Sequence, residues 1–153
     1  MKIPVPAQSE NLPEIAVAKD PEQIERCCAV MRELRPQVAA AEFTARVQAQ
    51  EREGYRLIYL SLGNEVRAVA GVRIFGLLFS GRTLYIDDLV TRETDRSKGY
   101  GDALFKWVIE YAKSEGCETL SLDSGVQRFA AHRFYLNHGL DITAHHFVMK
   151  LDA

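Results

Sequence analysis

The feature that most constrains this chain is a short glycine-containing segment, residues 96–101, which reads R-S-K-G-Y-G. β-branched and aromatic residues between Thr83 and Thr91 predict a strand before it, and apolar residues at helical spacing predict a helix after it, up to Gly116. The segment therefore lies at a strand-to-helix junction. The first backbone N–H groups of a helix lack internal partners and carry the positive end of the helix dipole, so such a junction can hold an anion.

The residues of this segment suit a phosphate group. Gly99 and Gly101 have no Cβ to keep phosphate oxygens away from the main chain, and Arg96 and Lys98 add positive charge. A tight turn made by the two glycines is the simpler alternative. The dinucleotide fingerprint G-x-G-x-x-G and the Walker loop G-x-x-x-x-G-K-[ST] are both absent, so the pattern indicates a different phosphate-binding loop.

Length and composition predict a single globular domain over residues 1–153, because 47% of the residues are hydrophobic. The formal net charge of −2 provides no broad basic field and argues against nucleic acid as a partner. Neither a membrane-length apolar run nor a signal-peptide pattern is present, so we expect a soluble, cytoplasmic protein with no membrane partner. Cys27, Cys28 and Cys117 lack metal-ligand spacing and are expected to be reduced and buried.

The whole pattern predicts the order β-α-α-β-β-β-α-β-α-β, with hairpins first and crossovers later, which indicates a mixed sheet covered by helices. The predicted strands are 15–18, 55–62, 66–79, 83–91, 119–123 and 142–151. The predicted helices are 20–36, 38–53, the one that ends at Gly116, and 126–137.

A second motif lies close to the C-terminal end, where Ala131, Tyr135 and Gly139 form A-x-x-x-Y-x-x-x-G. Together with the loop and the order of elements, it resembles the GNAT superfamily of N-acetyltransferases over nearly the whole chain. That family typically has R/Q-x-x-G-x-G/A in the loop and N-x-x-A-x-x-x-Y-x-x-x-G-F in the later helix. This chain departs from the second pattern at Arg128, which replaces Asn, and at Leu140, which replaces Phe.

The resemblance implies a fold, a cosubstrate and a set of binding residues. The fold is α/β (α+β), a GNAT-like mixed, mostly antiparallel central sheet of about six to seven strands flanked by four helices. The cosubstrate is acetyl-CoA, whose pyrophosphate the loop amides would hold, and no metal is implied. The implied cofactor-binding residues are Leu89, Val90, Thr91, Arg96, Ser97, Lys98, Gly99, Tyr100, Gly101, Arg128 and Tyr135.

Acetyl transfer to an amine needs a group near the amine proton, because a lysine-like amine with a pKa of ~10.4 is mostly ammonium at neutral pH. Asp87 and Asp88 are the candidate acceptor-binding residues, and strand alternation predicts that their side chains point to opposite faces. Asp87 is favoured because it matches the catalytic glutamate of the spermidine acetyltransferase branch, nine residues before the loop arginine Arg96. A water relay, simple ammonium binding and two merely solvated carboxylates remain alternatives.

The thiolate that leaves the thioester also needs stabilisation, and Tyr135 matches the general-acid tyrosine of the family. A core position beside Phe134 is the alternative for this side chain.

These features predict an acetyl-CoA-dependent N-acetyltransferase that transfers the acetyl group directly to a primary amine in a ternary complex. The acidic pair slightly favours a small amine or polyamine-like acceptor over an antibiotic, an amino acid or a protein amine, and a homodimer stays open. The alternative is a non-catalytic module on the same fold that senses acyl-CoA or binds a protein. A phosphate binder unrelated to acyl transfer would have no need of the motif from Tyr135 to Gly139.

Overall fold

The computed structural model describes residues 12–152. They belong to two compact units that divide between Ser121 and Leu122, and each unit is described by itself. The prediction of one domain over residues 1–153 stays a prediction.

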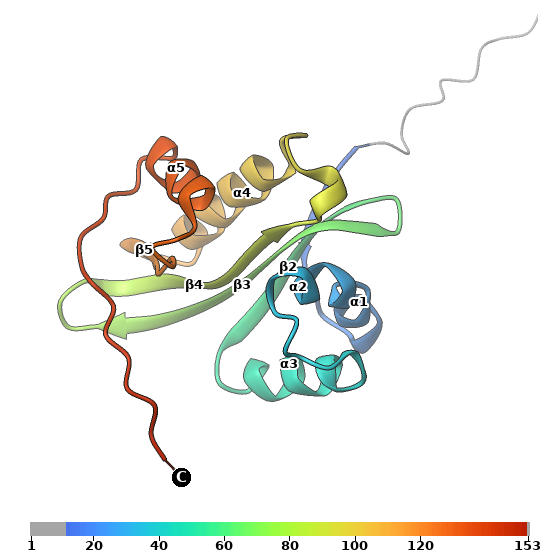
Figure 1. Ribbon diagram of the computed structural model, residues 1–153, viewed down its shortest axis with the longest axis horizontal. Coiled ribbons are helices and arrows are strands. Elements are labelled where there is room, and N and C mark those ends of the chain that lie inside the picture. The colour runs from blue at the N-terminus through green and yellow to red at the C-terminus, as the bar shows by residue number, and fades with distance from the viewer. Residues whose placement is uncertain (1–11, 153) are drawn as a thin grey trace, which may run out of the picture. The chain divides into compact units, whose positions relative to one another are not determined.

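The first unit is built on a five-stranded sheet with the spatial order β1-β2-β3-β4-β5 (Figure 1). The pairs β1–β2, β2–β3 and β3–β4 are antiparallel. Short turns connect β2 to β3 and β3 to β4, as the hairpin signals predict. The strands are β1 (Glu14–Val17), β2 (Tyr55–Leu62), β3 (Glu65–Leu77), β4 (Gly81–Thr91) and β5 (Thr119–Leu122).

Among residues 12–152, five α-helices and two 3-10 helices accompany the strands. The first α-helix starts as predicted, because Asp20 accepts a hydrogen bond from the Gln23 N–H (2.8 Å) and Pro21 occupies the first helical turn. No helix in the described part of the chain is long and apolar enough to cross a membrane. The helices are α1 (Pro21–Arg26), α2 (Cys28–Leu34), η2 (Ala40–Glu42), α3 (Phe43–Glu51), η3 (Glu93–Asp95), α4 (Tyr100–Ser114) and α5 (Phe129–Asn137).

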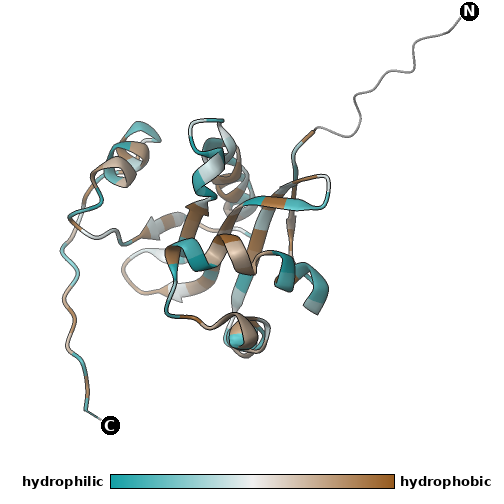
Figure 2. Ribbon diagram, turned by 45° about the vertical axis from the view of Figure 1, so that its right-hand side comes forward, coloured by the Kyte–Doolittle hydropathy of each residue, from teal (hydrophilic) through white to brown (hydrophobic). Residues whose placement is uncertain are grey.

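Helices cover both faces of the sheet in the first unit (Figure 1). The helices α1, α2 and α3 contribute Ile24, Met31 and Phe43 to a buried cluster with Leu57 and Tyr59 of β2. The helix α4 packs against β2, β3 and β4 on the opposite face. Figure 2 shows that the central strands are largely apolar, as a sheet covered on both faces requires. Each fully buried aliphatic side chain contributes about 1.5–3 kcal/mol.

The mixed α/β fold is confirmed, but the expected number of strands is wrong. The described residues form five strands instead of six to seven, and five α-helices instead of four. The first predicted helix is divided into α1 and α2 at Cys27, whose N–H bonds the Ile24 carbonyl in a tighter turn. The second predicted helix is shortened, because residues 40–42 form η2 ahead of α3.

The segment 142–151 is not a strand, although its β-branched and aromatic residues predict one. It has no regular secondary structure, and its apolar side chains are exposed. Strand composition alone does not make a strand, because a strand also needs a hydrogen-bonded neighbour. The apolar side chains concerned are Ile142, Phe147, Val148, Met149 and Leu151.

The cysteines belong to the packing of the first unit. Cys27 and Cys28 are buried, as predicted, whereas Cys117 is only partly buried, and all three are free thiols. Burial raises the pKa of the Cys27 thiol to about 12. Cys27 therefore stays protonated and acts as a small core residue.

Candidate active site

A β-bulge in β4 places Asp87 and Asp88 on the same face of the sheet. Asp88 lies opposite Gly71 of β3 and Ile86 lies opposite Val72, so Asp87 is an additional residue between the two pairs. A bulge of this kind shifts the alternation of side chains along a strand. The prediction that the two carboxylates point to opposite faces is therefore wrong.

A chain of contacts joins the two carboxylates on this face. Arg73 of β3 donates from Nε to Asp87 Oδ2 at 2.7 Å, and its guanidinium carbon lies 5.3 Å from the centre of the Tyr55 ring. The Tyr55 hydroxyl in turn donates to Asp88 Oδ2 at 2.9 Å. The two aspartates, Arg73 and Tyr55 form one network, which we call the carboxylate cluster.

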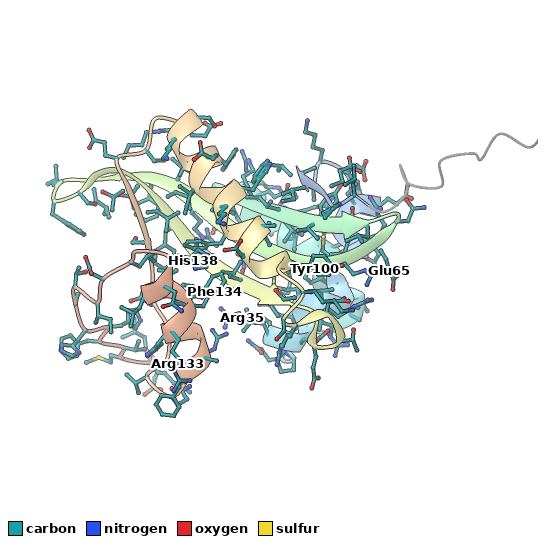
Figure 3. The ribbon with its side chains drawn as sticks, turned by 90° about the horizontal axis from the view of Figure 1, so that it is seen from above. Arg35, Glu65, Tyr100, Arg133, Phe134 and His138 are labelled. Atoms are coloured by element: carbon teal, nitrogen blue, oxygen red, sulfur yellow. The ribbon has the colours of Figure 1, made fainter. Side chains whose placement is uncertain are left out.

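Asp88 is the anchored member of the carboxylate cluster. Arg35, which follows α2 and is labelled in Figure 3, donates from Nε to Asp88 Oδ1 at 2.8 Å and from Nη2 to the Asp87 carbonyl at 2.9 Å. Both carboxylate oxygens of Asp88 therefore accept a hydrogen bond. Burial and the neighbouring Asp88 raise the pKa of Tyr55 well above its usual value, so the hydroxyl stays protonated and continues to donate.

Asp87 keeps one free acceptor atom. Its Oδ1 is buried and has no hydrogen-bond partner among the described residues. Burial raises the pKa of the Asp87 carboxyl, and the ion pair with Arg73 opposes this effect only in part. A buried acceptor without a partner is unfavourable, and a donor such as an amine or a water molecule would satisfy it. Of the two aspartates, Asp87 is therefore the one that keeps an unsatisfied acceptor atom.

The loop before α4 has the backbone geometry of an anion site. Ser97 (φ 67°) and Gly99 (φ 86°) are both left-handed, and α4 begins at Tyr100 with no side-chain cap. A Cβ at Gly99 would meet nothing within 4 Å, so glycine is required there for its conformation and leaves open space beside the helix start. Successive turns of this kind point backbone N–H groups to a common centre, where they can hold phosphate oxygens.

The two basic residues of this loop have different surroundings. Arg96 is exposed to solvent. Lys98 is also exposed, but its Nζ lies 3.1 Å from Asp95 Oδ1. The charge of Lys98 is thus already engaged within the protein.

Residues 89–91 lie at the end of β4, as expected for backbone contacts with an extended ligand. On one side they pair with residues 68–70 of β3. On the other side, β5 begins beside the start of β4, where the Glu118 N–H donates to the Arg82 carbonyl at 2.7 Å. Because β5 has four residues and β4 has eleven, β5 is too short to reach residues 89–91.

Arg128 and Tyr135 belong to the second unit. Arg128 precedes the first turn of α5, and its carbonyl accepts from the His132 N–H at 3.0 Å. The Tyr135 ring meets the edge of Phe134 with centroids 5.6 Å apart, and burial raises the pKa of Tyr135. The roles of both residues at the cofactor stay predictions.

Sequence reasoning missed Arg35, Tyr55 and Arg73. The available signal was Arg73 itself, which together with Arg67 is charged inside an otherwise apolar predicted strand. Among residues 12–152 no group of three or more His, Cys, Asp or Glu side chains could hold a metal ion.

Comparison with known proteins identifies the family. Residues 19–140 match the model of the acetyltransferase (GNAT) family, and the chain belongs to this family. The chain is also 37% identical over 107 residues to YhdJ of Bacillus subtilis (strain 168), named an uncharacterized N-acetyltransferase, covering 69% of this chain and 75% of that protein.

Solved structures share the fold. A transcriptional regulator from Bacillus halodurans C-125 has a TM-score of 0.77 at 22% identity, covering 92% of this chain and 100% of its own. The enzyme AAC(6')-Iy, solved with a bisubstrate analogue that contains CoA, has a TM-score of 0.77 at 11% identity, covering 93% and 99%. At these identities the likeness supports the GNAT fold alone.

The carboxylate cluster makes a stability prediction for Gly71. A Cβ at this position would collide with the Tyr55 hydroxyl and Asp88 Oδ2. We expect Gly71→Ala to lower the free energy of unfolding by about 1–3 kcal/mol, because the aromatic ring cannot move without breaking its hydrogen bond. The measurement is urea unfolding followed by circular dichroism.

Gly76→Ala is the matched control in the same strand. A Cβ at Gly76 meets nothing within 4 Å, so the change in unfolding free energy should stay within about 0.5 kcal/mol. Equal stability of the two variants would show that the space above Gly71 is not closed.

Proposed function

We propose that this protein transfers the acetyl group of acetyl-CoA directly to a primary amine in a ternary complex. The observation that carries the proposal is the left-handed loop and uncapped start of α4, which follow β4, the strand of Asp87 and Asp88, after the short helix η3. Membership of the acetyltransferase (GNAT) family supports acyl transfer. The acceptor amine, the mechanism and the use of acetyl-CoA are parts of the proposal.

In the proposed reaction, Asp87 Oδ1 accepts a hydrogen bond from the acceptor ammonium or from a water molecule beside it. The proton moves to this carboxylate or to water, and the freed amine nitrogen attacks the thioester carbonyl carbon. The C–N bond forms and the C–S bond breaks with its electron pair on sulfur, and the second proton that the nitrogen loses on becoming an amide neutralises the CoA thiolate. The hydroxyl of Tyr135 donates to the leaving sulfur, and backbone N–H groups near the end of β4 stabilise the carbonyl oxygen.

The charges of the carboxylate cluster weaken the argument for a polyamine. Each aspartate forms an ion pair with an arginine, Asp87 with Arg73 and Asp88 with Arg35, so the formal charges cancel. An acceptor with a single amino group, on a small molecule or on a protein, fits this neutral site, and a second cationic group on the acceptor is not required. No nucleic acid partner is proposed, in keeping with the net charge of −2.

An acceptor panel tests the proposed function. The protein is incubated with acetyl-CoA and, in turn, with amino acids, polyamines, aminoglycosides, amino sugars and lysine peptides, and the release of free CoA is measured. Release that depends on one amine supports the enzyme. Tight binding of acetyl-CoA without release by any amine favours the sensing module.

The loop before α4 predicts a strong effect of Gly99→Asp. The substitution places a side chain on a left-handed residue and a negative charge beside the phosphate position. We expect the affinity for acetyl-CoA to fall at least about tenfold, or roughly 1.4 kcal/mol, in isothermal titration calorimetry.

Gly116→Asp provides the matched control at the other end of the same helix. Gly116 is also left-handed (φ 76°), and a Cβ there also meets nothing within 4 Å. This variant should carry a similar strain and bind acetyl-CoA as the wild type does. Equal losses in the two variants would reject the phosphate site at the start of α4.

Asp87→Asn should lower the acceptor-dependent rate and leave the affinity for acetyl-CoA nearly unchanged. In the wild type the rate should fall as the pH drops through the pKa of Asp87, which burial places above that of an ordinary aspartate. Because protonated Asp87 cannot accept the proton, this acidic limb should vanish in the variant. The measurement is kcat/KM for the acceptor as a function of pH.

Asp88→Asn is the control for Asp87→Asn. Asp88 accepts from Arg35 and Tyr55, so its replacement should lower the unfolding free energy more than that of Asp87 and keep the acidic limb. If the acidic limb is lost in Asp88→Asn and kept in Asp87→Asn, the acceptor amine binds Asp88 and the assignment to Asp87 is wrong.

Tyr135→Phe keeps the ring and removes the hydroxyl. If this hydroxyl assists sulfur departure, turnover should drop on the order of tenfold to a thousandfold, with little change in acetyl-CoA binding. Steady-state kinetics with the acceptor found in the panel measures both quantities. Full turnover would leave Tyr135 with a packing role beside Phe134.

A further inference from the structure

Asp95 is a buried carboxylate that binds three cationic side chains. It lies in η3, between β4 and α4, and only 1% of it is exposed. Its oxygens accept from Arg67 Nη1 (2.9 Å), Arg92 Nε (2.5 Å) and Lys98 Nζ (3.1 Å). These partners come from β3, from the residue directly after β4 and from the loop before α4.

Glu65 extends this network on the solvent side. Its carboxylate accepts from Arg92 Nη1 at 2.7 Å and from Arg67 Nη2 at 3.1 Å. Figure 3 labels Glu65, the first residue of β3, and Tyr100, the first residue of α4. The Arg92 N–H also donates to the Arg67 carbonyl at 2.8 Å, so main-chain and side-chain bonds together tie the end of β4 to β3.

The network keeps Asp95 charged. Burial alone would raise the pKa of Asp95, but hydrogen bonds from Arg92, Lys98 and Arg67 outweigh it and lower the pKa to about 2. A buried carboxylate is tolerated only with such partners, and removing its charge would leave the arginines without their main acceptor.

The loop next to Asp95 holds a conformation that needs support. Ser97 is the only described residue other than glycine with a positive φ (67°), which costs of order 1 kcal/mol or more. Such a conformation persists only when the surrounding contacts impose it. Asp95 bonds Arg92 at one end of the loop and Lys98 directly after Ser97.

We propose that Asp95 is the positioning residue of the cofactor loop: it holds residues 92–99 so that the backbone N–H groups at the start of α4 face the pyrophosphate. Lys98 acts through Asp95 as part of this support and makes no direct bond to phosphate. The inference rests on the proposed function, because it assumes that acetyl-CoA binds at this loop.

The test is Asp95→Asn, which keeps the shape of the side chain and removes its charge. The KM for acetyl-CoA should rise about tenfold while kcat stays within about twofold, because the chemistry at Asp87 is not touched. Hydrogen exchange at the amides of residues 97–101 should become faster in this variant, with or without cosubstrate. An unchanged KM or unchanged exchange would overturn the inference.

Val30→Ala controls for a general loss of stability. Val30 is a buried residue of α2, 2% exposed, and is a member of the apolar cluster between the helices and the sheet. Its truncation should lower the unfolding free energy and leave the KM for acetyl-CoA unchanged. An equal rise of KM in both variants would show that Asp95 acts only through stability.

The double variant Asp95→Asn/Lys98→Met tests the path through Asp95. If Lys98 acts only through Asp95, the double variant should have the same KM for acetyl-CoA as Asp95→Asn. A further rise of this KM in the double variant would show that Lys98 also binds phosphate directly. A wild type that binds no acetyl-CoA would overturn the proposed function. A wild type that binds it, with an Asp95→Asn variant that binds equally well, would overturn only the role of Asp95.

Discussion

One additional residue in β4 reverses the alternation of side chains halfway along the strand. Ile86 packs on one face of the sheet, and after the bulge Asp87 and Asp88 both lie on the other, where Tyr55 and Arg73 meet them. Without the additional residue, one of the two carboxylates would point into the apolar layer beneath α4, where a charge is unfavourable. The bulge thus lets a buried strand carry two adjacent acids.

The two acids are stabilised in different ways, and this difference is the reason that Asp87 alone is proposed to bind the acceptor. Asp88 has a partner for each oxygen, and Gly71 leaves the space that the Tyr55 hydroxyl needs to reach it. Asp87 has Arg73 on one oxygen and an unsatisfied buried atom on the other. Hydrogen bonds to both oxygens fix the position of the Asp88 carboxylate, whereas one oxygen of Asp87 keeps the capacity to accept a further hydrogen bond.

Patterns within short stretches of the sequence predicted several strands and helices correctly. The strands β2, β3 and β4 and the helix α4 follow from alternation, helical spacing and flanking glycines, and the GNAT motifs followed from residues close together in the chain. The bulge was not predictable in this way, because a register is a property of two strands. The pair of Arg35 and Asp88 was equally hidden, since 53 positions separate its members. The segment 142–151 shows the converse error, in which composition suggested a strand and pairing did not follow.

The strand β3 contributes residues to both centres of the candidate site. Gly71 and Arg73 stand at alternate positions of β3 and share one face, and Arg67 lies nearer the start of the strand, where the pairing with β2 shifts register between Val66 and Ala68. Arg73 binds Asp87, Gly71 makes room for the bond between Tyr55 and Asp88, and Arg67 binds Asp95 beside the cofactor loop. A slip of one residue between β3 and its neighbours would move Gly71 and Arg73 to the other face together. The proposed acceptor side and the proposed cofactor side therefore both depend on the position of β3, and the apolar packing that holds this strand in place supports both.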